Sequence, residues 1–170
     1  SRSRTASRAA SAQTSNRKHP QAGSAATGQA PVTAACIEGN HMTTAAKPKV
    51  AFIGTGIMGA PIAGHIMDAG YELTVYNRTK SKADALVARG ATWAGSPADA
   101  ARDADVVFTM LGYPSDVEDV YLSTDGLVRA AKTGAWLVDL TTYSPQLARD
   151  IHDAAEVEDK HAVDCPVTGG

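Results

Sequence analysis

The sequence predicts an α/β protein built on a parallel β-sheet with helices on both faces. From Lys49 onward, short apolar runs alternate with segments of helical periodicity, as in βαβ units. A glycine-rich turn joins the first apolar run to the first helical segment. Hydrophobic residues make up 44% of the chain at a formal net charge of -2, which is typical of a globular protein. A chain of 170 residues accommodates one such domain and an extension.

The extension comes first. Residues 1–47 are rich in Ser, Ala, Thr, Gly and Gln and bury too little apolar surface to offset ordering entropy, so we predict disorder there and a domain at 48–170. Five basic residues precede the first acidic residue, Glu38, as in a transit peptide that would direct the protein to the mitochondrial matrix. Alternatively, Met42 is the initiator and residues 1–41 are translated upstream sequence. We favour the interpretation that residues 1–41 are upstream sequence, and with it a cytoplasmic location.

Four apolar runs are predicted as central strands, at residues 50–53, 73–76, 106–111 and 136–140. The last two lack polar alternation, so we expect helices to cover them on both faces. Apolar residues at helical spacing predict two sheet-covering helices between and after these strands. They are Met58, Ile62, Ile66 and Ala69 in the first helix, and Leu147, Ile151, Ala154 and Ala155 in the second.

Capping residues predict where helices begin and end. Ser96-Pro97 and Ser144-Pro145 each place a hydroxyl before a proline at the first helical position. Ser115 with Glu118 has the spacing of a capping box. Gly70 and Gly90 stand where helices should stop.

A G-x-G-x-x-G motif follows the first strand directly. Its residues are Gly54, Thr55, Gly56, Ile57, Met58 and Gly59. The first glycine permits a tight turn, the second lets the backbone approach a pyrophosphate, and the third lets helix and strand pack closely. The helix N-terminus attracts the anion. Because the next strand ends about 20 residues later, as the fold requires, the sequence predicts a doubly wound Rossmann domain that binds a dinucleotide.

The second strand ends in Asn77, Arg78 and Thr79, where an NAD enzyme would carry a ribose-binding carboxylate. An acid there would repel a 2′-phosphate, whereas an amide, a guanidinium and a hydroxyl can all bind one. The sequence therefore favours NADP over NAD. The alternative is that Arg78 and Lys80 are only solvated loop cations.

Four motifs follow one another within residues 49–170. They are the glycine-rich loop with Val75 to Thr79, then Phe108 to Leu111, Asp139 to Pro145, and Asp164 to Gly170. Together they resemble the β-hydroxyacid dehydrogenase family, which includes 3-hydroxyisobutyrate dehydrogenases and tartronate semialdehyde reductases, with 6-phosphogluconate dehydrogenases as distant relatives. Tyr143 departs from the family, where an aliphatic residue is more usual, so no single substrate is named.

The resemblance implies an NAD(P)-dependent oxidoreductase that interconverts a small β-hydroxy acid and its semialdehyde, and the residues after the second strand favour NADP. It places Met110 and Leu111 in the cofactor cleft, Thr142 near the nicotinamide, and Thr168, Gly169 and Gly170 on the substrate carboxylate. The general acid-base lysine is expected beyond Gly170. The helical domain that usually mediates homo-oligomer formation is expected to be absent as well, so we predict that this chain alone is inactive.

Several other classes are disfavoured. Cys36 and Cys165 form neither a disulfide framework nor a zinc motif, and the histidines lack metal-ligand spacing. The charge balance gives no reason to expect nucleic acid, and no apolar run is long enough for a membrane span. Two alternatives stay open. One is an imine reductase, which shares this cofactor domain but replaces the lysine; the other is a non-catalytic dehydrogenase-like module.

Overall fold

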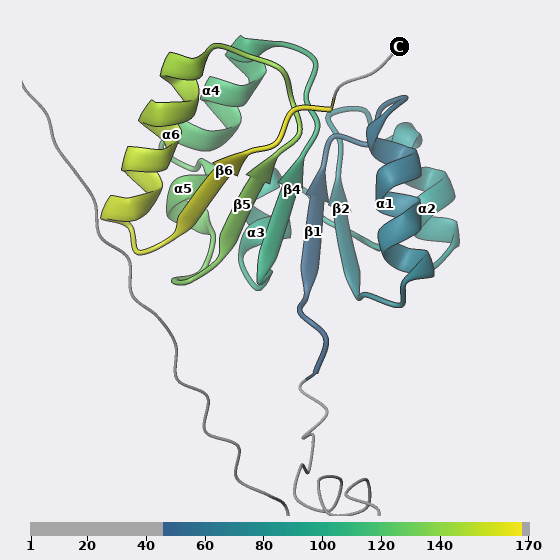
Figure 1. Ribbon diagram of the computed structural model, residues 1–170. Coiled ribbons are helices and arrows are strands. Elements are labelled where there is room, and N and C mark those ends of the chain that lie inside the picture. Colours follow the sequence, from purple (N-terminus) through teal and green to yellow (C-terminus); the bar gives the residue numbers. More distant parts are fainter. Residues whose placement is uncertain (1–45, 168–170) are drawn as a thin grey trace, which may run out of the picture. The chain divides into compact units, whose positions relative to one another are not determined.

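The computed structural model describes residues 46–167, which form a six-stranded sheet in the order β3-β2-β1-β4-β5-β6 (Figure 1). Every neighbouring pair of strands is parallel. The strands are β1 (Val50–Ile53), β2 (Leu73–Tyr76), β3 (Thr92–Trp93), β4 (Val106–Thr109), β5 (Trp136–Asp139) and β6 (His161–Asp164). The helices are α1 (Gly59–Asp68), α2 (Asp84–Ala88), α3 (Pro97–Ala101), α4 (Pro114–Leu122), α5 (Leu127–Ala130) and α6 (Pro145–Val157), with a 3-10 turn at Lys80–Ala83.

The strand order changes direction at β1. The chain runs outward through β2 and β3 on one side and through β4, β5 and β6 on the other. Val50 of β1 therefore pairs with Leu73 on one side and with Val106 on the other. In a parallel sheet this reversal leaves a crevice beyond the carboxyl ends of the strands, where the ligands of doubly wound folds bind.

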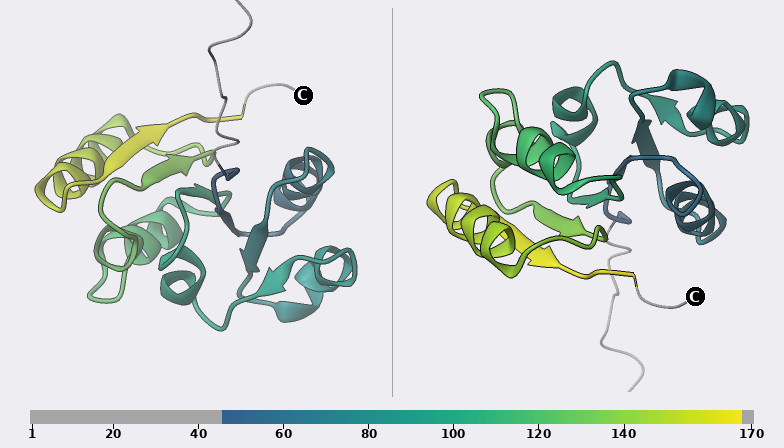
Figure 2. Two further views of the ribbon diagram at one scale, coloured as in Figure 1. Left: turned by 90° about the horizontal axis from the view of Figure 1, so that it is seen from below. Right: turned by 90° about the horizontal axis from the view of Figure 1, so that it is seen from above.

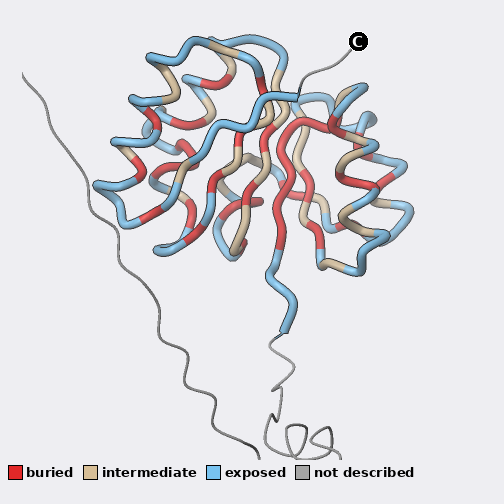
Figure 3. Tube along the Cα trace, in the orientation of Figure 1, coloured by how far each residue is buried: buried red, intermediate tan, exposed pale blue. Residues whose placement is uncertain are grey.

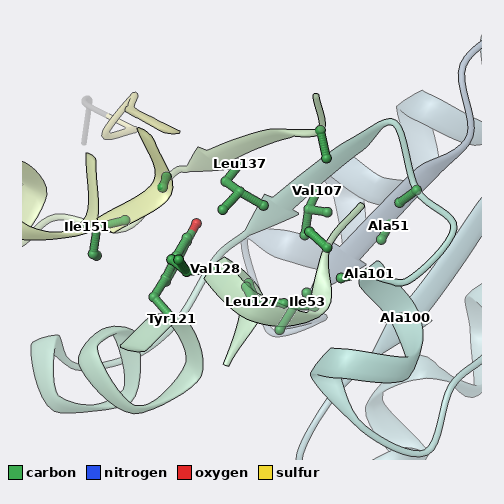
Figure 4. Close-up of a cluster of buried hydrophobic side chains, with 14 of the residues drawn as sticks. Ala51, Ile53, Ala100, Ala101, Val107, Tyr121, Leu127, Val128, Leu137 and Ile151 are labelled. Atoms are coloured by element: carbon green, nitrogen blue, oxygen red, sulfur yellow. The ribbon is translucent and has the colours of Figure 1, made fainter. Parts of the chain in front are cut away.

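Alternate residues of β1 enter two separate apolar clusters, one on each face of the sheet. Val50 and Phe52 pack with α1, α2 and β2. Ala51 and Ile53 pack with α3, α4, α5 and α6 in the larger cluster (Figure 4). Seen along the strands, the two groups of helices lie on opposite faces of the sheet (Figure 2). The predicted fold class is thus confirmed.

The outer strands are covered on one face only. Leu137 is fully buried, but Trp136 and Val163, which point to the α1 side, are 50% and 44% exposed. Most of β6 has the colour of exposed residues in Figure 3. The prediction that residues 136–140 are covered on both faces is therefore wrong for the described part of the chain, and Val106 and Phe108 of β4 are only partly covered. An apolar run predicts a strand, but which face a helix covers depends on where the connections run.

The predicted helix ends are mostly confirmed. The hydroxyls of Ser96 and Ser144 accept hydrogen bonds from backbone N–H groups three residues on. Gly70 and Gly90 adopt positive φ directly after α1 and α2. The capping box at Ser115 is wrong, because Pro114 occupies the first turn of α4 and moves the N-cap to Tyr113, which makes no side-chain cap.

Some predicted boundaries and faces also change. Strands β4 and β5 end at Thr109 and Asp139, before the predicted limits of 111 and 140. On α1, Ile62 and Ile66 pack against the core as expected, but Met58 and Ala69 are exposed. The residues that α1 buries are Gly59, Ala63 and Gly64, so small residues let this helix lie close to the sheet. Nearly all of the predicted extension, residues 1–47, lies outside the described residues.

Candidate functional site

A cavity of about 1090 Å³ opens at the carboxyl ends of β1, β2 and β4. Its walls come from the glycine-rich loop after β1, the loop after β2, the start of α3, and the segment from Met110 through α4. This volume is slightly above the usual range of about 300–1,000 Å³ for ligand and cofactor pockets. The cavity therefore occupies the crevice that the strand order predicts.

The three glycines of the loop have different surroundings. A Cβ atom on Gly54, which has a φ of +98°, would lie 2.1 Å from the Met110 carbonyl oxygen, and one on Gly59 would lie 1.9 Å from the Gly54 carbonyl oxygen. Both glycines are therefore required for packing. A Cβ atom on Gly56 would meet nothing within 4 Å, although Gly56 lines the cavity. The open space at Gly56 fits the close approach of a pyrophosphate to the backbone.

The N-terminus of α1 faces this space without a side-chain cap and without an acidic residue in its first turn. Its N–H groups and dipole are therefore available to an anion. Ile57 is 94% exposed at the cavity wall, and Met58 is also exposed. Apolar side chains of this size gain free energy when a bound ligand covers them.

Asn77 holds the glycine-rich loop against the end of β2. The backbone N–H of Thr55 donates to Asn77 Oδ1 at 2.9 Å, and Asn77 Nδ2 donates to the Thr79 carbonyl oxygen at 2.9 Å. An amide nitrogen carries two hydrogens, so one donor stays available for a ligand. Sequence reasoning assigned Asn77 to a phosphate alone and missed this bracing role, because the partner lies 22 residues away.

Charged side chains of both signs line the cavity. The cations are Arg78, Lys82, Arg102 and Arg129, and the anions are Asp99, Asp116, Asp119 and Asp125. Arg78 Nη1 lies 3.3 Å from Asp116 Oδ1, and Arg102 Nη2 lies 3.0 Å from Asp99 Oδ1. The sequence analysis predicted Arg78 but none of the acidic residues, which carry no local motif.

Hydrogen bonds join the loops after β4 and β5 at the other end of the cavity. The N–H of Leu111 donates to Thr141 Oγ1 at 2.9 Å, and the N–H of Thr141 donates to Asp139 Oδ1 at 2.8 Å. Leu111 and Met110 line the cavity. Asp139 therefore fixes, through Thr141, the wall that these two residues form.

Asp139 lies in a buried polar cluster behind that wall. Burial raises the pKa of its carboxyl, and the Thr141 N–H, which donates to Oδ1, and the nearby hydroxyls of Thr141, Thr109 and Tyr143 partly oppose the rise. The other carboxylate oxygen, Oδ2, is buried without a hydrogen-bond partner. Burial, together with the Asp139 carboxylate, also raises the pKa of the Tyr143 phenol. The Tyr121 hydroxyl lies 2.7 Å from Thr109 Oγ1, and burial raises the Tyr121 pKa well above its usual value. These tyrosines are therefore neutral at physiological pH.

Most of the predicted cofactor residues line this one cavity. They are Gly54, Gly56, Ile57, Met58, Gly59, Asn77, Arg78, Thr79, Met110 and Leu111. Thr55 and Thr142 do not line it; Thr55 is buried with its hydroxyl unpaired, and Thr142 is exposed. Thr168, Gly169 and Gly170 lie outside the described residues.

Across 46–167, no group of three or more His, Cys, Asp or Glu side chains is placed to hold a metal ion. In the same range, the helices are all too short or too polar to cross a bilayer.

A strand-order switch, a glycine-rich loop and a cavity at that point together define a Rossmann-type nucleotide-binding domain. Residues 49–170 match the family described as the NAD binding domain of 6-phosphogluconate dehydrogenase. The chain belongs to this family of nucleotide-binding domains.

Similar proteins include both hydroxyacid and imine enzymes. A probable mitochondrial 3-hydroxyisobutyrate dehydrogenase-like protein of Arabidopsis thaliana is 46% identical over 132 residues, which is 77% of this chain and 40% of that protein. The NAD-dependent L-serine dehydrogenase of Pseudomonas aeruginosa is 43% identical over 122 residues, 72% of this chain and 41% of that protein. An imine reductase from Myxococcus stipitatus in complex with NADP+ matches with a TM-score of 0.63 and 30% identity, over 69% of this chain and 40% of that one.

The chain thus spans about two fifths of the length of these relatives. The resemblance to β-hydroxyacid dehydrogenases is confirmed.

Proposed function

We propose that this domain binds NADP(H) and belongs to an enzyme that transfers hydride between the cofactor and a small β-hydroxy acid or its semialdehyde. Suitable substrates are 3-hydroxyisobutyrate and tartronate semialdehyde. The observation that carries the proposal is the cavity lined by Gly56 at one point and by Asn77, Arg78 and Thr79 at another, with no carboxylate at the end of β2. When bound, NADPH would supply hydride to the substrate carbon.

The residues after β2 support NADP over NAD. The Arg78 side chain is 82% exposed, so its guanidinium has room to pair with a 2′-phosphate. Thr79 offers a hydroxyl at the same wall. Because one relative is an NAD-dependent L-serine dehydrogenase and a similar structure holds NADP+, the family uses both cofactors. The side chains at this wall must therefore determine whether NADP or NAD is preferred.

Lys132 and Lys160 lie away from the cavity, so neither supplies the acid-base group. Lys132 pairs with Asp105, which directly precedes β4, and the buried Lys160 directly precedes β6. Both lie at the amino ends of strands, whereas the cavity lies at the carboxyl ends. We therefore propose that residues 1–170 bind the dinucleotide but do not turn over a hydroxy acid, and that the carboxylate substrate, the lysine and the homo-oligomer contacts belong to the full-length enzyme.

Calorimetric titration of the folded chain with NADPH and with NADH tests the cofactor assignment. We expect NADPH to bind more tightly than NADH. The variant Arg78→Asp should weaken NADPH binding by about tenfold or more, because it removes a cation and adds an anion near the 2′-phosphate. The same variant should change NADH binding little. Lys80→Asp is the matched control, because Lys80 follows the same strand but does not line the cavity. Absence of heat with either dinucleotide would overturn the proposal, and an unchanged NADPH/NADH preference in Arg78→Asp would overturn the choice of NADP.

Imine reduction is the second candidate, because the Myxococcus stipitatus imine reductase shares the fold of this domain and was solved with NADP+. A non-catalytic dinucleotide-binding module is the third. Turnover of the full-length protein with semialdehydes and with cyclic imines separates the three. Oxidation of NADPH in the presence of a semialdehyde supports the hydroxyacid enzyme, and oxidation in the presence of a cyclic imine supports the imine reductase. No oxidation with either substrate supports the non-catalytic module. We propose a cytoplasmic location, or a mitochondrial one if residues 1–41 are a transit peptide.

A further inference from the structure

An ion pair joins two walls of the cavity. Arg78 follows β2, and Asp116 lies in the first turn of α4, which follows β4. These two strands flank β1 on either side, so the pair joins the loops on both sides of the glycine-rich loop. Arg78 Nη1 and Asp116 Oδ1 are 3.3 Å apart, and both residues line the cavity.

The side chains of Arg78 and Asp116 differ in how freely they can move. The Asp116 side chain is 29% exposed and stands on a helix, whereas the Arg78 side chain is 82% exposed on a loop. A long, exposed arginine exchanges rotamers at little cost, so Arg78 is the partner that can move. A carboxylate and a phosphate offer a guanidinium the same kind of bidentate anionic acceptor. An adenosine 2′-phosphate would therefore compete with Asp116 for Arg78.

We propose that Asp116 is a specificity-determining residue, whose carboxylate pairs with Arg78 when no 2′-phosphate is bound and thereby lowers the affinity for NADPH but not for NADH. The inference rests on the proposed binding of NADP(H) through Arg78. The helix dipole favours an acid in the first turn of α4, but within the described residues the hydrogen-bond partner of the Asp116 carboxylate is Arg78.

The size of the effect follows from the exposure of the pair. Exposed ion pairs contribute little, and here the carboxylate would also repel a phosphate close to it. We expect Asp116→Asn to tighten NADPH binding about three- to tenfold, and to change NADH binding by less than about twofold. Asparagine keeps the shape of the side chain, so the helix should be retained.

The matched control is Asp119→Asn. Asp119 lies one turn further along α4 and lines the same cavity, but within the described residues it forms no ion pair. The variant Asp119→Asn removes the same charge without breaking an ion pair. Its effect on binding should therefore be small and similar for NADPH and NADH. Calorimetric titrations with NADPH and NADH are made on the full chain, on both variants, on Arg78→Ala and on the double variant Arg78→Ala/Asp116→Asn, with circular dichroism as a check on folding.

Selective tightening of NADPH by Asp116→Asn, reduced in the Arg78→Ala background, supports the inference. Three results overturn it: unchanged NADPH affinity, equal tightening of NADPH and NADH, or an equal effect of Asp119→Asn. If Arg78→Ala weakens NADPH while Asp116→Asn does nothing, only this inference fails. If Arg78→Ala changes neither affinity, the proposed NADP specificity fails and the role of Asp116 fails with it.

Discussion

Replacing Gly56 with alanine should abolish tight dinucleotide binding and leave the fold unchanged. The added Cβ atom would meet no protein atom within 4 Å, and Gly56 does not have the positive φ that disfavours alanine. We therefore expect the free energy of unfolding to change by less than about 1 kcal/mol. The methyl group would, however, stand where a pyrophosphate approaches the backbone, so NADPH should bind about ten- to a hundredfold more weakly.

Gly59→Ala is the contrasting variant in the same loop. Its Cβ atom would lie 1.9 Å from the Gly54 carbonyl oxygen and 3.1 Å from the Phe52 ring, so α1 must move away from β1. Overpacking of this kind costs about 1–3 kcal/mol or more. Urea unfolding followed by circular dichroism measures the stability of both variants, and calorimetric titration measures NADPH binding. Undiminished NADPH affinity in Gly56→Ala would refute the placement of the pyrophosphate, and wild-type stability in Gly59→Ala would refute the packing argument.

Two carboxylates should give opposite pH dependences of stability. Burial raises the pKa of Asp139 from 3.8, so the wild type should lose unfolding free energy relative to Asp139→Asn as the pH rises above that value. The hydrogen bond from Lys132 lowers the pKa of Asp105 from 3.8, so the wild type should lose unfolding free energy relative to Asp105→Asn as the pH falls below it. Urea unfolding of the three proteins across this range measures both effects, and slopes of the same sign would contradict the burial of Asp139. Ser96→Ala should cost about 1 kcal/mol by removing a helix cap, whereas Ser115→Ala should change stability by less than about 0.5 kcal/mol; equal losses in urea unfolding would argue against the observed caps.

Local chemistry predicted the inner strands and several helix ends. Residues 50–53 and 73–76 form β1 and β2 within the predicted limits, because a run of apolar and β-branched residues of that length suits a buried parallel strand. Ser96 and Ser144 cap their helices because the hydroxyl and the following proline act within one turn. These features depend on residues that are close in the sequence, so the sequence itself is enough to predict them.

Strands β3 and β6 were not predicted. They lie at the two edges of the sheet, where only one side of a strand is paired. The residues of β6 are mostly exposed, and β3 has only two residues. An edge strand needs no long apolar run, so its pairing depends on the strand already beside it.

The candidate site also has features that the sequence predicts and features that only the tertiary structure shows. The G-x-G-x-x-G spacing and the missing acid after β2 are properties of the sequence, and they predicted the loop, the dinucleotide and most of the cavity residues. Three contacts join segments that follow different strands of the sheet. They are the hydrogen bond from Thr55 to Asn77, the ion pair of Arg78 with Asp116, and the link from Asp139 to Leu111 through Thr141. No spacing predicts them.

The sequence by itself determined that this chain forms a parallel α/β domain with a phosphate-binding loop after its first strand, because periodicity, caps and glycines act over a few residues. Only the tertiary structure decided which glycine faces open space, which carboxylate faces Arg78 and which strands stay open on one side. Those outcomes depend on strand order, and strand order brings together the carboxyl ends of β2, β1 and β4, which are far apart along the chain.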